Sequence, residues 1–213
     1  MGSATPKQYL AVGSKPLIVR TLESLDRCPD IDGLVLAVPS DRISETLVLV
    51  RTHGLRKVWN TVAGGAERQD SVQNALAVLP EGAGWVVVHD AVRPFVSVGK
   101  ISETIRAAKA FGAAVLAVPS TDTVKQAEDG WVVGTLDRGK LWRVQTPQAF
   151  RRDWLVEAYG RAAQDGYRST DDAALVERIG HPVRIVEGEI QNIKITSRED
   201  LILAEAYCRE EKP

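Results

Sequence analysis

Short runs of apolar, β-branched residues alternate along this chain with segments in which apolar residues recur every three or four positions. The first pattern is typical of strands that are buried on both faces, and the second of amphipathic helices. The expected strands are 34–38, 57–62, 85–88 and 113–118, and the expected helices are 41–53, 67–79, 97–111 and 197–208. Strands and helices that alternate in this order predict an α/β fold, Rossmann-like, with a mainly parallel sheet flanked by helices.

Residues at the ends of these segments refine the prediction. Asp41 is the expected cap of the helix 41–53, and Ser197-x-x-Asp200 has the spacing of a capping box at the start of the closing helix. The strand 85–88 is apolar at every position, so we expect it to be central. A chain of 213 residues suits one domain with room for an excursion, and we expect a single domain over 1–213.

The segment 120–150 interrupts the alternation of strands and helices. Thr123–Ala127 and Trp131–Val133 flank the turn sequence Glu128-Asp129-Gly130, and this arrangement predicts a β-hairpin. An isolated hairpin is at best marginally stable in water. We therefore predict that 120–150 protrudes as a β-hairpin arm and packs on a second copy of the chain, which gives a homodimer.

Composition and charge exclude several classes of protein. The 27 lysines and arginines nearly balance the 28 aspartates and glutamates, which argues against a broad attraction to nucleic acid or to anionic lipid. The apolar runs are far shorter than the roughly 20 residues that cross a membrane. The first residues show neither a secretory signal nor a myristoylation pattern, so we expect a cytoplasmic protein. Cys28 and Cys208 are expected to be packing residues.

Polar residues that follow the expected strands are the first candidates for chemistry, because ligands of open α/β sheets bind beyond the carboxyl ends of the strands. Asp90 comes directly after the strand 85–88 and His89, and Arg93 follows three residues later. A carboxylate in this place suits Mg²⁺, which also binds substrate phosphates. An Asp90–Arg93 ion pair that closes the loop explains the same residues about equally well.

Other candidates are weaker when each is considered alone. Gly64-Gly65 precedes a helix whose free amides could bind an anion, although a tight turn explains a diglycine more often. Lys7 and Lys194 are single cations among apolar neighbours, a setting in which most lysines are merely solvated. His89 is interpreted as a structural imidazole, since no nucleophile or second metal ligand stands at a suitable spacing.

Seven motifs follow one another along the chain: Pro6-Lys7-Gln8-Tyr9, Gly64-Gly65-x-Glu67-Arg68-x-Asp70-Ser71-Val72, Val88-His89-Asp90-Ala91-x-Arg93-Pro94, Asp122-Thr123-x-Lys125, Thr146-Pro147-Gln148, Thr170-Asp171-Asp172 and Asn192-Ile193-Lys194-Ile195-Thr196. Together they resemble the 2-C-methyl-D-erythritol 4-phosphate cytidylyltransferase family, from the first residue to the closing helix. The resemblance implies transfer of the cytidylyl group of CTP to this sugar-alcohol phosphate, with release of pyrophosphate, in non-mevalonate isoprenoid precursor synthesis.

The resemblance also implies a role for each matching residue. The implied catalytic residues are Lys7, which stabilises the triphosphate, and Arg138 and Lys194, which position the methylerythritol phosphate. The implied nucleotide-binding residues are Gly65, Ala66, Arg68, Ser71 and Asp90, of which Asp90 also helps to place Mg²⁺ or another divalent cation. The implied further contacts of the sugar phosphate are Arg93, Thr123, Thr146 and Thr170. Since Arg138 lies in the expected arm, the family arrangement has it reach into the site of the partner subunit.

One part of the family pattern does not appear in the sequence. Family members carry a glycine-rich loop, Ala-Ala-Gly-x-Gly-x-Arg, immediately before the stretch that matches Met1. We therefore expect reduced cytidylyltransferase activity from this chain. Two alternatives stay open: a ribitol 5-phosphate cytidylyltransferase, whose family shares much of the pattern, and an inactive, N-terminally truncated α/β dimer.

Overall fold

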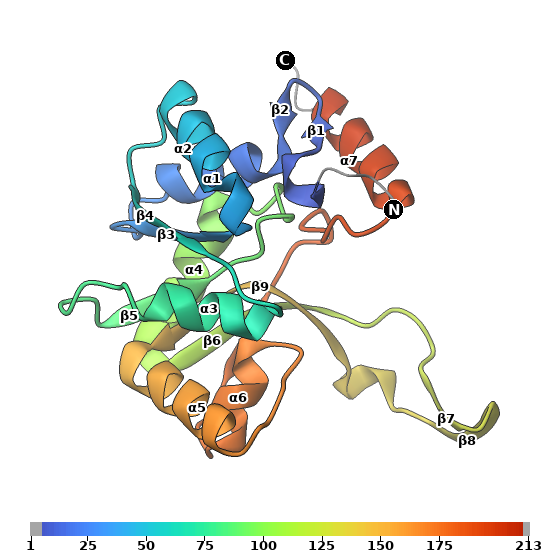
Figure 1. The fold of residues 1–213 in the computed structure, drawn as a ribbon. Coiled ribbons are helices and arrows are strands. Elements are labelled where there is room, and N and C mark those ends of the chain that lie inside the picture. Colours follow the sequence, from blue (N-terminus) through green and yellow to red (C-terminus); the bar gives the residue numbers. More distant parts are fainter. Residues whose placement is uncertain (1–5, 211–213) are drawn as a thin grey trace.

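The predicted alternation of strands and helices is present in the computed structural model, which describes residues 6–210 (Figure 1). The helices are α1 (Leu17–Arg27), α2 (Ile43–Thr52), α3 (Arg68–Leu76), α4 (Val98–Phe111), α5 (Arg152–Gln164), α6 (Asp172–Arg178) and α7 (Arg198–Glu210). The strands are β1 (Ala11–Val12), β2 (Lys15–Pro16), β3 (Leu34–Val38), β4 (Val58–Ala63), β5 (Trp85–Val88), β6 (Ala113–Pro119), β7 (Lys125–Glu128), β8 (Trp131–Thr135), β9 (Trp142–Arg151) and β10 (Arg184–Glu187). The short 3-10 helices are η1 (Lys7–Tyr9), η2 (Ser40–Arg42) and η3 (Arg138–Lys140). The first five residues, whose lack of a signal pattern is noted above, lie outside the described residues.

The central sheet has the strand order β10-β6-β9-β5. In this sheet β10 and β6 are parallel, and β9 is antiparallel to both β6 and β5, so that three of its strands share one direction. A second parallel pair, β3 and β4, forms a separate two-stranded sheet. The α/β fold with a mostly parallel sheet and flanking helices is therefore confirmed.

Helices cover both faces of the central sheet. Residues of β6 alternate between two apolar clusters: Ala114 and Leu116 pack with α1 and α4, whereas Ala113 and Val115 pack with α5 and α6. Because successive side chains of a strand point to opposite faces, full burial of this apolar run requires a helical layer on each side. Cys28 packs in the first of these clusters, as predicted for a packing cysteine.

The prediction that 85–88 forms a central strand is wrong for the described chain. Within residues 6–210, β5 pairs with β9 alone and forms the end of the central sheet. Its apolar sequence has another cause, since Val87 packs against the α1 and α4 layer while Val86 and Val88 pack against the layer of α5 and α6. Coverage of both faces produces the same pattern in an edge strand as in a central one.

The ends of the helices show which capping predictions hold. Ser197 Oγ accepts from the amide of Asp200 at 3.1 Å, and Asp200 accepts from the amide of Ser197 at 2.8 Å, so the predicted capping box of α7 is confirmed. The prediction that Asp41 caps the helix after it is wrong. Asp41 lies inside η2, and α2 begins after Arg42 without a side-chain cap.

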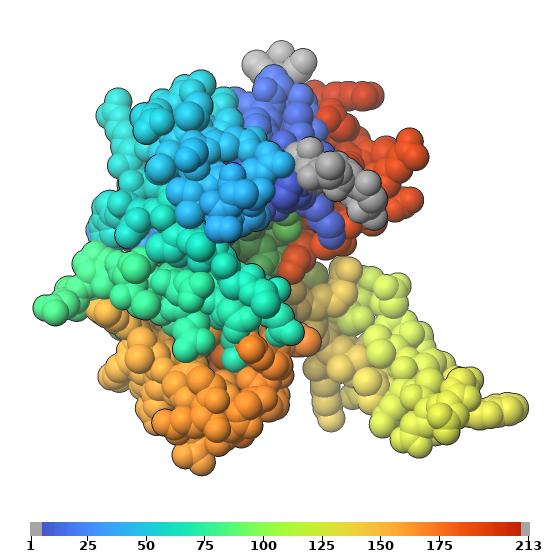
Figure 2. Space-filling view, viewed as in Figure 1, coloured from blue at the N-terminus to red at the C-terminus, as the bar shows by residue number. Residues whose placement is uncertain are grey.

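The predicted hairpin is present as β7 and β8, and the segment that carries it stands away from the rest of the molecule (Figures 1 and 2). Asp129 and Gly130 adopt positive φ angles of 48° and 83°, which these two residue types tolerate better than most others. Trp131 is 78% exposed, and Val132 and Val133 are exposed beside it. No helix among the described residues has the length and apolar character needed to cross a membrane.

Candidate functional site

A pocket of about 300 Å³ opens beyond the carboxyl end of β5. Its walls come from the start of α3, the loop after β5, strand β9, and the loops that precede α6 and α7. The lining residues are Arg68, Asp90, Arg93, Val144, Gln145, Thr146, Gln148, Thr170, Asp171 and Lys194.

Asp90 is the centre of a charged cluster in this pocket. Its Oδ1 accepts from Nε of Arg68 at 3.1 Å, and its Oδ2 lies 3.1 Å from Nζ of Lys194 and 3.4 Å from Nε of Arg93. The sequence offered two interpretations of Asp90 and Arg93, and the loop ion pair between them is present. It is one contact of a larger cluster, in which a single carboxylate faces three cations.

The surroundings of the cluster fix its ionisation. Burial raises the pKa of Asp90, but the opposite charges of Arg68, Lys194 and Arg93 outweigh burial and lower the pKa to about 2. Burial lowers the pKa of Arg68, whereas Asp172 and Asp90 raise it, and the net result is a raised pKa. Asp90 and Arg68 are therefore both charged across the physiological pH range.

His89 belongs to a hydrogen-bond chain behind this cluster. The amide of Asp90 donates to Thr146 Oγ1 at 3.1 Å, and this hydroxyl lies 2.9 Å from Nδ1 of His89. The other ring nitrogen, Nε2, lies 3.3 Å from the carbonyl oxygen of Arg93. Burial lowers the pKa of His89 to about 4, so the imidazole is neutral, with Nδ1 the acceptor and Nε2 the donor in the arrangement that satisfies both contacts. The chain fixes the backbone from which Asp90 and Arg93 project.

The diglycine lies in a tight turn before α3. The amide of Gly64 donates to the carbonyl of Val38 at 2.7 Å, and the amide of Gly65 donates to Ser71 Oγ at 3.0 Å. A side chain at position 65 would come within 2.2 Å of Cβ of Asp70, so the close approach requires glycine there. The tight-turn interpretation of the diglycine therefore holds, and the amides of both glycines are paired within the protein.

The structure brings together half of the residues singled out from the sequence. Those that line the pocket are Arg68, Asp90, Arg93, Thr146, Thr170 and Lys194. Gly65 and Ala66 lie in the turn before α3, Ser71 lies within α3, and Lys7 lies exposed on η1; these four are not among the residues that line the pocket. Thr123 and Arg138 lie on the arm, where Arg138 donates to the carbonyl of Thr121 at 3.3 Å. In a single chain, these two residues do not line the pocket.

Several residues in and beside the pocket received no role from the sequence. Gln148, Asp171 and Asp172 stood within quoted motifs, and that was the available signal for them. Tyr159, which donates a hydrogen bond to Asp172 at 2.5 Å, lies inside the helical segment α5. Nothing in the spacing of the sequence distinguishes Tyr159 from a tyrosine of the core.

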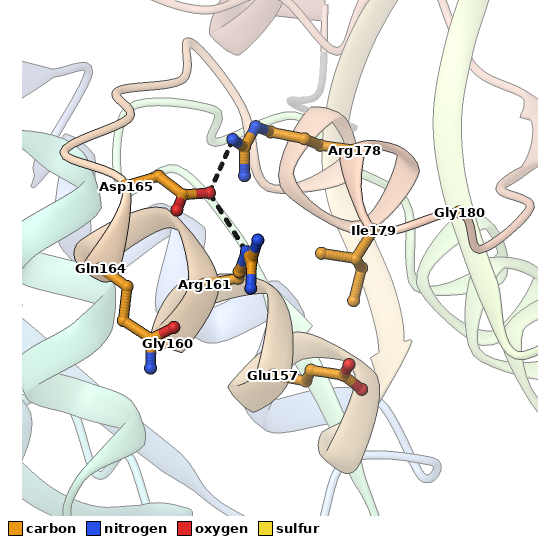
Figure 3. A pocket seen from close by; sticks show the side chains of 8 residues that line it. All are labelled: Glu157, Gly160, Arg161, Gln164, Asp165, Arg178, Ile179 and Gly180. Carbon is orange, nitrogen blue, oxygen red and sulfur yellow. Dashed lines mark hydrogen bonds and ion pairs between the residues drawn. The ribbon is translucent and has the colours of Figure 1, made fainter.

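A larger groove of about 960 Å³ lies between α5 and the end of α6 (Figure 3), and it shares no lining residue with the Asp90 pocket. Figure 3 shows Arg161 and Arg178 turned toward the same carboxylate, Asp165. Nε of Arg161 lies 3.2 Å and NH2 of Arg178 lies 2.7 Å from Oδ2 of Asp165. The charges in this groove compensate one another on the surface. We therefore place the candidate site at Asp90, where cations converge on a partly buried carboxylate at the end of a strand.

A divalent cation fits the pocket in a limited way. No group of three or more metal-ligating side chains lies within residues 6–210. Asp90 supplies one carboxylate, and of its two oxygens Oδ1 receives a single donor, which leaves a lone pair available. Mg²⁺ is often bound by one or two carboxylates, with water and substrate phosphates completing its coordination. The residues therefore fit Mg²⁺ only together with a phosphorylated substrate.

An α/β fold with cations gathered at the carboxyl end of a strand is typical of proteins that bind anionic ligands there. The family model for 2-C-methyl-D-erythritol 4-phosphate cytidylyltransferase matches residues 1–210. The protein of this description from Syntrophus aciditrophicus is 49% identical over 214 residues, which cover 100% of this chain and 92% of that protein. Its counterpart from Geobacter metallireducens is 44% identical over 217 residues, which cover 100% of this chain and 94% of that protein.

Solved structures agree with these sequence matches. The crystal structure of 4-diphosphocytidyl-2C-methyl-D-erythritol synthase from Anaerococcus prevotii superposes with a TM-score of 0.89 at 32% identity, covering 98% of this chain and 92% of that one. The crystal structure of the 2-C-methyl-D-erythritol 4-phosphate cytidylyltransferase from Thermus thermophilus superposes with a TM-score of 0.80 at 36% identity, covering 96% of this chain and 94% of that one. The chain belongs to the 2-C-methyl-D-erythritol 4-phosphate cytidylyltransferase family. The family, the enzyme class and the reaction predicted from the motifs are confirmed.

Proposed function

We propose that the Asp90 pocket is the place where this chain transfers the cytidylyl group of CTP to 2-C-methyl-D-erythritol 4-phosphate. The observation that carries the proposal is the convergence of Arg68, Arg93 and Lys194 on one carboxylate at an open strand end. In the reaction, a phosphate oxygen of the sugar alcohol attacks the α-phosphorus of CTP, and the bond to pyrophosphate breaks. Two polyanions must therefore meet, and fixed cations stabilise the charge that accumulates between them.

The nucleotide contacts in this proposal come from the turn before α3 and from Lys7. Gly65, Ala66 and Ser71 contact cytosine and ribose in this proposal, and Arg68, the first residue of α3, extends into the pocket. Lys7 stabilises the triphosphate. When bound at Asp90, Mg²⁺ would neutralise phosphate charge near the α-phosphorus.

The sugar-phosphate contacts fall into two groups. Arg93, Thr146, Thr170 and Lys194 line the pocket, and Lys194, with 41% of its side chain exposed, has room to leave Asp90 for a substrate phosphate. The hydroxyl of Thr146 is already hydrogen-bonded to the amide of Asp90 and to the ring of His89. In the free enzyme, Thr146 therefore stabilises the loop that follows β5.

Arg138 and Thr123 form the second group, and we propose that the arm brings them to the partner's pocket. The apolar tip at Trp131, Val132 and Val133 favours this arrangement, because an exposed patch of this kind is typical of an interaction surface. The unit of function would then be a homodimer of single-domain chains, each with residues 120–150 as its dimerisation arm. The cytoplasmic location and the exclusion of nucleic acid stay predictions from the sequence.

A pyrophosphate-release assay tests the proposed function. With CTP, Mg²⁺ and methylerythritol phosphate, we expect turnover that falls sharply in Lys194→Ala and is unchanged in the control Lys109→Ala, which removes an exposed lysine from α4. Ribitol 5-phosphate is the comparison substrate. Faster turnover of ribitol 5-phosphate than of methylerythritol phosphate would identify the chain as a ribitol 5-phosphate cytidylyltransferase instead. Equal activity of the two lysine variants would show that the Asp90 pocket is not the reaction site.

A further inference from the structure

Asp172 is a fully buried carboxylate directly beside the candidate site, with an exposed fraction of 0%. Its Oδ1 accepts from the hydroxyl of Tyr159 at 2.5 Å, and its Oδ2 accepts from NH2 of Arg68 at 2.7 Å. Burying a carboxylate is unfavourable unless donors and an opposite charge satisfy it. Tyr159 and Arg68 supply both requirements, and they do so from different helices.

Arg68 connects this buried carboxylate to the pocket. Its Nε donates to Asp90, and its NH2 donates to Asp172, so that two carboxylates from separate parts of the fold hold one guanidinium. Rotating the planar group would break at least one of these charge-assisted hydrogen bonds. The remaining N–H groups of Arg68 stay available at the pocket wall.

The position of Asp172 is itself fixed from the sheet. The side chain of Gln148 on β9, 1% exposed, accepts from the amide of Ala173 at 3.0 Å and donates to Asp171 at 3.1 Å. Tyr159, 3% exposed, holds the carboxylate from α5, which packs beside α6 (Figure 1). Burial and the neighbouring Asp172 raise the pKa of Tyr159, so its hydroxyl stays a donor.

We propose that Asp172 and Tyr159 are positioning residues for the nucleotide, acting through Arg68. They hold the guanidinium in one orientation before CTP arrives, so that binding does not have to order a long, flexible side chain. This inference rests on the proposed function, because Arg68 is a nucleotide contact only if CTP occupies this pocket. A purely structural pair would join α5 to α6 and would have no effect on nucleotide binding.

The test compares three variants in kinetics and stability. Tyr159→Phe removes only the hydroxyl that donates a hydrogen bond to Asp172. Asp172→Asn is a second variant, and it weakens the contacts of Asp172 with both Tyr159 and Arg68. Thr104→Val is the control: it removes one buried hydroxyl, bonded to the carbonyl of Lys100 in α4. We expect KM for CTP to rise about tenfold in Tyr159→Phe and more in Asp172→Asn. In both variants KM for the sugar phosphate should stay within about twofold of the wild type, and Thr104→Val should lose stability alone.

A double-mutant cycle with Arg68→Lys shows whether the effect passes through the guanidinium. Lysine carries one charged group and cannot bridge two carboxylates in the same way, so Tyr159→Phe should raise KM for CTP no further in that background. An additive effect, or kinetics of Tyr159→Phe that equal those of Thr104→Val, would overturn the inference. Absence of CTP binding to the wild type by calorimetry would instead overturn the proposed function, and the inference with it.

Discussion

Among single residues, Asp90 has the largest share in the chemistry we assign to the site. Asp90→Asn preserves the shape of the side chain but removes the charge that faces three cations and the oxygen that Mg²⁺ would use. We expect kcat/KM for CTP to fall about ten- to hundredfold, since hydrogen bonds to charged groups are worth about 1.5–3 kcal/mol, while the circular dichroism spectrum stays that of the wild type. The control is Asp165→Asn, which removes a surface carboxylate directly after α5. Unchanged turnover and unchanged Mg²⁺ dependence in Asp90→Asn would show that Asp90 has no role in metal binding and serves only to stabilise the loop through its ion pairs.

His89 makes the stability of the fold depend on pH. Its pKa is about 4 in the folded chain and near 6.5 when unfolded, so below pH 6.5 the unfolded chain binds a proton that the folded chain does not. The free energy of unfolding should therefore fall by about 3 kcal/mol between pH 7 and pH 4. Urea titration measures this. His89→Asn, which keeps an acceptor near Thr146 but does not titrate, should lose much less over the same range. Asp90 contributes in a separate window, because its stabilisation disappears only as the pH falls below about 4. If the wild type and His89→Asn lost the same free energy of unfolding between pH 7 and pH 4, groups other than His89 would cause the pH dependence.

The sequence predicted site residues where a motif places charge at the end of a strand, and it failed where a residue acts through a buried partner. Asp90 and Arg93 were found in this way and do meet in space. The roles of Lys194 and Arg68, the other two cations that contact Asp90, came from the resemblance. The contact between Tyr159 and Asp172 joins two helices through the interior, and no local pattern encodes such a contact.

Among the elements, the four strands and four helices expected from the pattern are present, but the helices α1 and α5 and the strand β9 received no prediction, although α1 buries an apolar face. Strand β10 was missed because four residues with one buried side chain give no pattern. Helix α6, seven residues long, is too short to establish a period. Strand β5 was placed centrally because helices on both faces make an edge strand equally apolar. Periodicity reports burial, whereas strand order depends on which edges meet.

The arm is the element whose partner we predict most specifically. Trp131→Glu places a charge at the tip where the hairpin would contact a second copy. We expect the wild type to sediment as a dimer at micromolar concentration and the variant as a monomer, because burying a charge at an apolar interface is unfavourable. Val48→Glu, on the exposed face of α2, is the control and should leave the dimer intact. A wild type that sediments as a monomer would exclude the arm as a dimerisation element.

For the whole molecule, the charge of the pocket explains why one chain would be insufficient. Three cations line it, against the carboxylates Asp90 and Asp171, so little positive charge is left for two polyanionic substrates. Arg138 from a partner would add to it. Arg138→Ala and Lys194→Ala should each raise KM for the sugar phosphate about tenfold or more, with KM for CTP within about twofold, as steady-state kinetics can show. The reverse pattern, with CTP binding lost and sugar-phosphate binding kept, would mean that the two residues serve the nucleotide.

Mixing these two variants tests whether Arg138 serves the partner. In a mixed dimer, the subunit with Arg138→Ala keeps Lys194 and receives an intact Arg138 from the other arm, so one of the two sites is complete. After dissociation and random reassociation of equal amounts, half the dimers are mixed, and the activity should recover to about a quarter of the wild-type value. If Arg138 acted within its own chain, every site would lack one of the two cations. The mixture would then be no more active than the average of the separate variants, and the arm would have no catalytic role across the interface.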